Sequence, residues 1–108
     1  MILTVQSCGG NNTRYRLGIN IEDSKKYFKK RKIDILISIG IEKFHIKTSC
    51  GKIEKEKFLK GFDLYSKELS QFIIDNNWNN YVQMKPTKID FNYENIDNLI
   101  ELTFISVI

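Results

Sequence analysis

GFDLYSKELSQFIIDNNW, residues 61–78, is the stretch from which the fold of this chain is best read. Its apolar side chains recur on one face of a helix with 3.6 residues per turn, at Tyr65, Leu69, Phe72 and Ile73. Asp63 is a candidate N-cap and Ser66 a second, because short polar side chains accept hydrogen bonds from the first N–H groups of a helix. Asp75-Asn76-Asn77 predicts the end, so we expect a helix over about 63–77, followed by Trp78 as an anchor.

The residues before this helix predict strands. Residues 2–7 form a short apolar segment, and the turn sequence Gly9 to Asn12 separates it from residues 13–21. In that second segment, four apolar residues alternate with Arg14, Arg16, Gly18 and Asn20. The pattern predicts a hairpin whose second strand is buried on one face and presents Arg14 and Arg16 to solvent.

A short basic helix is predicted next, over about residues 23–32, with Asp23 or Ser24 as its cap. It has only Tyr27 and Phe28 to dock against a core. Residues 33–39 are nearly all apolar and predict a strand buried on both faces, which Gly40 interrupts.

Four further segments complete the chain. Residues 44–50 alternate as a strand, and residues 52–60 fit either a short edge strand or a charged loop. Residues 79–86 predict a loop, and 87–93 and 99–107 predict two last strands. We therefore expect an α+β fold in a single small domain, residues 1–108. Its antiparallel or mixed sheet of six or seven strands curls into an open barrel with two helices.

Composition narrows the class of protein. With 42% hydrophobic residues and one Pro, the chain is expected to fold around a modest core. The sequence from Met1 lacks the features of a secretory signal, and no run is long enough for a membrane helix, so we expect a cytoplasmic protein and no membrane partner. Two cysteines, Cys8 and Cys50, do not form a disulfide framework, although a single bridge between them is open.

Catalytic patterns are missing from the sequence. His45 has no Cys or His at metal-ligand spacing, and Gly51-Lys52 lacks the first glycine of a phosphate-binding loop. Asp23-Ser24-Lys25 resembles part of a nuclease core, but the only acid upstream of it is the adjacent Glu22, so the core lacks its first metal ligand. We therefore expect no enzyme, no metal and no cofactor.

Charge is unevenly distributed along the chain. Residues 1–21 have two Arg and no acid, and residues 22–60 have twelve Lys or Arg against six Asp or Glu. Residues 61–108 have three Lys against seven acids. A basic first half favours an anionic partner. The candidate nucleic-acid-binding residues are Arg14, Arg16, Lys25, Lys26, Lys29, Lys30, Arg31, Lys32, Lys43 and Lys47.

The second half resembles a known family. Gly61-Phe62, Phe72-Ile73, Asn76-Asn77 and the segment Pro86 to Phe91 are spaced as in B3-type DNA-binding domains, which include recognition and effector domains of some restriction enzymes. Pro86-Thr87 stands where that family has Gly-Asp. The resemblance implies a seven-stranded pseudobarrel with two helices that grips DNA with basic loops and strand ends of its first half.

Two functions follow from these observations. The first is a small non-enzymatic module that binds nucleic acid (DNA) through the basic first half, and the sequence leaves the choice between DNA and RNA open. The alternative is a protein-interaction module, such as an inhibitor or accessory protein of a mobile genetic element, that docks an acidic protein surface. A Lys-rich surface that is merely solvated is the third reading of the same residues.

Overall fold

A computed structural model describes residues 1–8, 14–27, 32–49, 53–54, 57–58, 63–80, 85–97 and 99–108. In these parts the chain forms two helices, α1 (Ile21–Tyr27) and α2 (Lys67–Asp75). Nine strands accompany them: β1 (Ile2–Ser7), β2 (Tyr15–Gly18), β3 (Lys32–Ile39), β4 (Glu42–Ser49), β5 (Ile53–Glu54), β6 (Lys57–Phe58), β7 (Asp63–Leu64), β8 (Lys88–Ile96) and β9 (Leu99–Val107).

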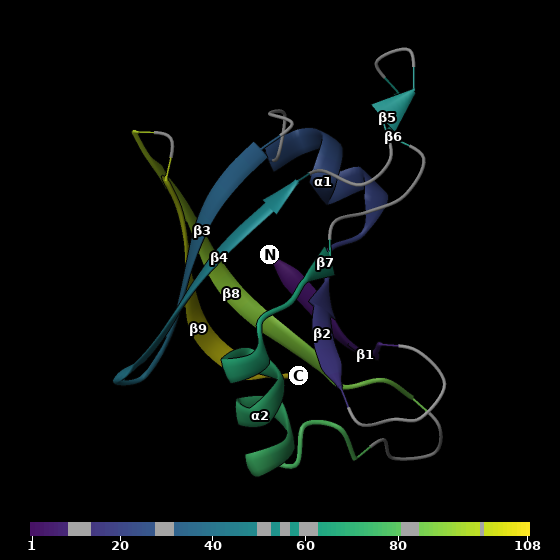
Figure 1. The fold of residues 1–108 in the computed structure, drawn as a ribbon, viewed down its shortest axis with the longest axis vertical. Helices are drawn as coiled ribbons and strands as arrows, with labels where there is room; N and C mark the ends of the chain where they lie inside the picture. The colour runs from purple at the N-terminus through teal and green to yellow at the C-terminus, as the bar shows by residue number, and fades with distance from the viewer. Residues whose placement is uncertain are drawn as a thin grey trace.

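Seven of these strands form one mixed sheet in the order β4-β3-β9-β8-β1-β2-β7. All neighbours are antiparallel except β3 and β9, which run parallel. The sheet curls until its edge strands β4 and β7 come close without pairing, so the barrel has an open seam (Figure 1). The predicted α+β fold, a single small domain with an open barrel and two helices, is confirmed.

The core lies inside this barrel and follows the alternation of the strands. Every second residue points inward, as Leu3 and Val5 do on β1 and Ile35 and Ile37 on β3. Phe91 of β8 is fully buried and is among the largest core side chains. The intervening residues face outward, and they form the surface on which a binding site can lie.

Helix α2 covers one end of the barrel (Figure 1). Its N-cap is Ser66, whose Oγ accepts a hydrogen bond from the Leu69 N–H at 3.0 Å. At its C-terminus Asn77 has φ 59°, and the Trp78 N–H donates to the Ile73 carbonyl at 3.0 Å, which is the Schellman arrangement. The turn delivers the Trp78 ring against Phe72 at 5.3 Å between centroids. The predicted anchoring role of Trp78 is confirmed.

The predicted start of this helix at Asp63 is wrong. Asp63 and Leu64 form β7, which pairs with Gly18 and Leu17 of β2. Leu64 is fully buried and belongs to the core. Backbone bonds to β2 therefore hold residues 63 and 64 extended, and the helix begins only at Lys67, after the second cap candidate.

Helix α1 also differs from its prediction. It spans Ile21–Tyr27 instead of 23–32, and its cap is Asn20, whose Oδ1 accepts from the Asp23 N–H at 2.8 Å. Neither Asp23 nor Ser24 is the cap; the Ser24 hydroxyl donates to the Asn20 carbonyl at 2.7 Å. Lys32 belongs to β3, where it pairs with Ser49, because strand pairing overrides the helical preference of a Lys-rich run.

Two smaller predictions have different outcomes. Strand β3 is not buried on both faces, since Ile35 and Ile37 are buried while Leu36 and Ser38 are only half-buried. Gly40 bends the chain as predicted, with φ 61° in the turn to β4.

Cys8 carries a free thiol, and Cys50 lies outside the described residues. In the described part of the chain, no helix is long and apolar enough to cross a membrane.

Candidate functional site

The predicted basic residues are distributed over several elements. Arg14 is exposed directly before β2, and Arg16 is half-buried within it. Lys25 and Lys26 are on α1, which follows β2 after two residues. The remaining members lie on β3 and β4 or outside the described residues: Lys32 on β3, Lys43 and Lys47 on β4, and Lys29, Lys30 and Arg31 outside.

Barrel closure brings the basic strands β2 and β4 to the two sides of the seam. β4 is one edge strand of the sheet. The other edge strand is β7, which has only two residues, and β2 is its neighbour. On β4 the exposed Lys43 alternates with buried Phe44, so Lys43 faces outward. We call the wall formed by β2, β7 and β4 the seam sector.

Acidic side chains lie both in the seam sector, as Glu42 on β4 and Asp63 on β7 do, and on other strands of the barrel wall. β8 and β9 are central in the sheet, and there Glu94 lies directly opposite Glu101. Asp97 is exposed in the turn that joins the two strands. Like charges opposite each other in a sheet repel, so this pair is maintained at a cost in stability.

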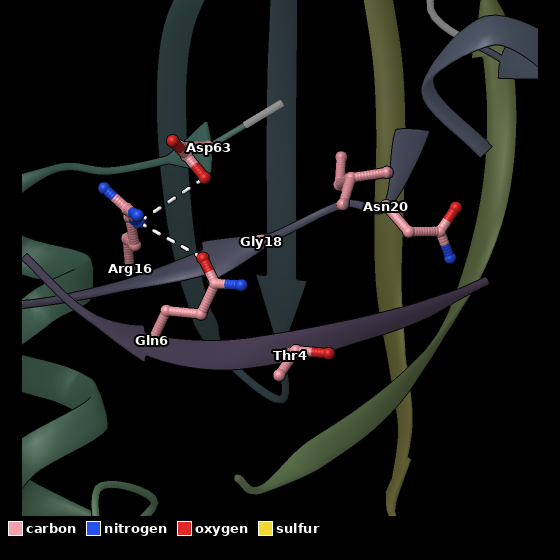
Figure 2. Close-up of a pocket in the computed structure, with 7 residues that line it drawn as sticks. Thr4, Gln6, Arg16, Gly18, Asn20 and Asp63 are labelled. Carbon is pink, nitrogen blue, oxygen red and sulfur yellow. Dashed lines mark hydrogen bonds and ion pairs between the residues drawn. The ribbon is translucent and has the colours of Figure 1, made fainter. Parts of the chain in front are cut away.

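A hollow of about 360 Å³ opens on the outer face beside β2 (Figure 2). Its centre is Gly18, which pairs with Thr4 of β1 on one side and with Asp63 of β7 on the other. Because Gly18 has no side chain, the outer face is recessed at this point. The lining residues are Thr4, Gln6, Arg16, Gly18, Ile19, Asn20 and Asp63.

Arg16 links two opposite walls of the hollow. Its Nε lies 3.4 Å from Asp63 Oδ1 and donates to Gln6 Oε1 at 3.3 Å (Figure 2). Both partners come from neighbouring strands, Gln6 as the direct cross-strand partner of Arg16 and Asp63 from the opposite side of β2. Arg16, predicted as a solvent-facing contact, is therefore a half-buried residue that fixes two other side chains.

The orientation of Gln6 depends on Gly18. A Cβ added to Gly18 would lie 2.7 Å from Gln6 Oε1 and 2.9 Å from Gln6 Nε2. The amide thus occupies the space that a side chain at position 18 would need. With its oxygen directed at Arg16, the Gln6 amide turns its nitrogen toward the interior of the hollow (Figure 2).

Other polar residues around the hollow are committed to the fold. Both amide atoms of Asn20 form hydrogen bonds with Asp23 at the start of α1.

Two polar residues outside the hollow also have partners. On β8, Asp90 accepts a hydrogen bond from the N-terminal amine of Met1 at 3.3 Å. The only histidine of the chain, His45, is exposed as predicted, and its Nε2 lies 3.9 Å from Asp34 Oδ1, too exposed a pair to add much stability.

Sequence reasoning identified Arg16 but missed the residues that surround it. Thr4, Gln6, Gly18 and Asp63 are spread over most of the first 63 residues, and no local pattern connects them. The one available signal was Gly18 within an alternating strand, since an isolated strand glycine marks a close approach to the backbone.

Comparison of the chain with protein-family models, with curated proteins and with solved structures finds no match. Among the described residues, no group of three or more His, Cys, Asp or Glu side chains is arranged to hold a metal ion. A functional proposal therefore has to come from the seam sector and its hollow.

Proposed function

We propose that this protein is a small, non-enzymatic DNA-binding module of the cytoplasm that places the seam sector and α1 against the nucleic acid. The observation that supports the proposal is the excess of Lys and Arg over Asp and Glu in residues 1–60 of the sequence. Arg14, Arg16 and Lys43 lie on or beside the strands that flank the seam, and Glu94 and Glu101 lie on central strands.

This arrangement suits a polyanion for two reasons. Lys and Arg that contact phosphates release condensed counterions, which supplies most of the affinity of non-specific DNA binding. The acidic pair on β8 and β9 adds orientation, because a phosphate backbone is repelled from that part of the wall. Lys25 and Lys26 are on α1, which follows β2 in the chain. The basic residues Lys29, Lys30 and Arg31 follow α1 in the chain after Phe28.

The experiment distinguishes an effect of where the positive charges lie from an effect of the net charge of the protein. Binding of labelled duplex, single-stranded DNA and RNA is measured by fluorescence anisotropy over a range of salt. The first variant, Arg14→Gln with Lys43→Gln, removes two positive charges from the seam sector. The control variant adds Glu94→Gln and Glu101→Gln to these changes, which restores the wild-type net charge of +4.

We expect both variants to bind DNA more weakly than wild type, with a salt slope reduced by about one for each phosphate contact that is lost. Recovery of wild-type affinity in the control variant would mean that only net charge matters, and the seam sector would lose its role. Absence of binding by wild type at low salt to any of the three probes would overturn the proposed function.

A further inference from the structure

We infer that one strand of the bound nucleic acid runs along β2, with two adjacent phosphates held by Arg14 and Arg16. The inference rests on the proposed function and deepens it, because it assigns the contact that positions the strand. It starts from a difference between the two arginines. Arg14 is exposed, whereas Arg16 is half-buried and fixed at its Nε atom by Gln6 and Asp63.

Arg14 and Arg16 lie on the same outer face of the barrel. The Cys8 N–H donates to the Arg14 carbonyl at 2.8 Å, so the pairing of β1 with β2 continues to residue 14. Tyr15 lies between the two arginines and is buried, and successive side chains of a strand point to opposite faces. Both arginines therefore project outward, and their Cα atoms are about 7 Å apart, as expected for positions i and i+2 of a strand.

This spacing suits a nucleic-acid backbone. Adjacent phosphates of one strand are separated by a similar distance, so a strand that runs along β2 would present one phosphate to each arginine. Proteins that bind single strands without reading their sequence have a positively charged groove that follows the backbone in this way. A phosphate contact reads no base, so the pair of arginines would set the position of the strand and not its sequence.

Arg16 has hydrogen-bond donors that its contacts within the fold do not use. Its contacts with Gln6 Oε1 at 3.3 Å and with Asp63 Oδ1 at 3.4 Å both involve Nε, and the terminal nitrogens have no partner among the described residues. No buried side-chain nitrogen in that part of the chain lacks a partner, so the terminal nitrogens are open to solvent. One of them extends away from both partners (Figure 2). A guanidinium with free terminal N–H groups can bind phosphate through two parallel hydrogen bonds.

The two arginines have different roles. Gln6 and Asp63 hold the Arg16 guanidinium from β1 and β7, so less conformational freedom is lost when it binds a phosphate. The Asp63 carboxylate also offsets part of the Arg16 charge. Arg14 has no ion pair with a described residue, so its full charge is available. Arg14 therefore supplies attraction, and Arg16 supplies orientation.

The first experiment uses two oligothymidine strands that have the same number of neutral methylphosphonate linkages. In one strand the neutral linkages alternate with charged phosphates, and in the other they are grouped, so that the charged phosphates are consecutive. Only the grouped strand offers adjacent charged phosphates to Arg14 and Arg16. In fluorescence anisotropy at low salt, we expect wild type to bind the grouped strand about three- to tenfold more tightly, the effect of one phosphate contact.

The second experiment repeats this comparison with protein variants. Arg16→Lys retains the net charge of +4, and it should lose the preference for the grouped strand, because an ammonium has no planar set of parallel donors. Arg14→Gln should lose the preference as well. Lys67→Gln is the control, since it removes one charge from the exposed first residue of α2, and it should retain the preference. Should Arg16→Lys fail to fold, Arg14→Gln decides, and a wild-type preference in it would overturn the inference.

The outcomes separate the inference from the proposed function. Equal affinity of wild type for the two strands overturns the pair of phosphate contacts and leaves nucleic-acid binding intact. A preference that folded Arg16→Lys retains overturns the role of Arg16, because any positive charge at that position would then be sufficient. Absence of wild-type binding to fully charged oligothymidine and to its duplex overturns the proposed function, and the inference with it.

Discussion

Ser70→Ala is expected to destabilise the protein well beyond the loss of one hydroxyl group. Strand β7 pairs with Leu17 and Gly18 of β2, and no strand among the described residues pairs with the start of β2 on that side. There the Tyr15 backbone N–H donates to Ser70 Oγ of α2 at 2.9 Å. The hydroxyl therefore replaces a missing strand partner and joins α2 to the strand that carries Arg16.

The magnitude follows from burial. Ser70 is 4% exposed and Tyr15 is 6% exposed, so water is excluded from the N–H group when the hydroxyl is removed. A buried donor left without a partner costs about 1–3 kcal/mol. Taking about 2 kcal/mol, the unfolding constant rises roughly thirtyfold. The melting temperature falls by about 8–16 °C, at about 4–8 °C per kcal/mol for a small domain.

Urea unfolding followed by fluorescence measures this change directly. Trp78 is the single tryptophan, and its ring lies 5.3 Å from that of Phe72 and 5.8 Å from that of Phe104. Its emission therefore reports the packing of α2 on the barrel. With a slope of about 2 kcal/mol per M, the midpoint should fall by about 1 M urea while the slope stays unchanged.

Ser106→Ala is the matched control, because Ser106 lies exposed on β9. It should remain within about 0.5 kcal/mol of wild type. A Ser70→Ala protein as stable as this control would show that the Tyr15 N–H finds another partner. The argument that α2 completes the edge of β2 would then be wrong.

Three further changes test other features by the same unfolding assay. Ser66→Ala removes the acceptor for the Leu69 N–H and should cost about 1 kcal/mol, and no loss would show that the cap is replaced by solvent. Gly40→Ala should cost about 1–2 kcal/mol from backbone strain alone, because φ is 61° and no atom lies near the added methyl group; an unchanged midpoint would contradict this. Glu101→Gln should stabilise by about 0.2–1 kcal/mol by relieving repulsion from Glu94, and the gain should shrink in high salt; a salt-independent gain would point to another cause.

The alternation of apolar and polar residues determined most of the fold. It identified the strands of the sheet except β7, and it identified the buried face of those whose residues alternate, since period-two patterning leaves only one way to bury the apolar set. It did not do so for β3, whose nearly continuous apolar run predicted burial on both faces. The apolar stripe with Ser66 and Trp78 likewise determined α2. Element ends were less well predicted, because Asp63 and Lys32 become strand residues only when β2 and β4 are there to pair with them.

The candidate site was decided by the tertiary structure. The sequence alone predicted that Arg16 faces outward and that the first half of the chain is basic. Neither prediction says which other residues lie next to Arg16 in space. Gln6 and Asp63 both contact Arg16 because of the register in which β1, β2 and β7 pair. The paired residues of β2 and β7 are more than forty positions apart in the chain. Backbone pairing across the sheet sets which outward side chains are neighbours, and the local pattern of apolar and polar residues carries no record of it.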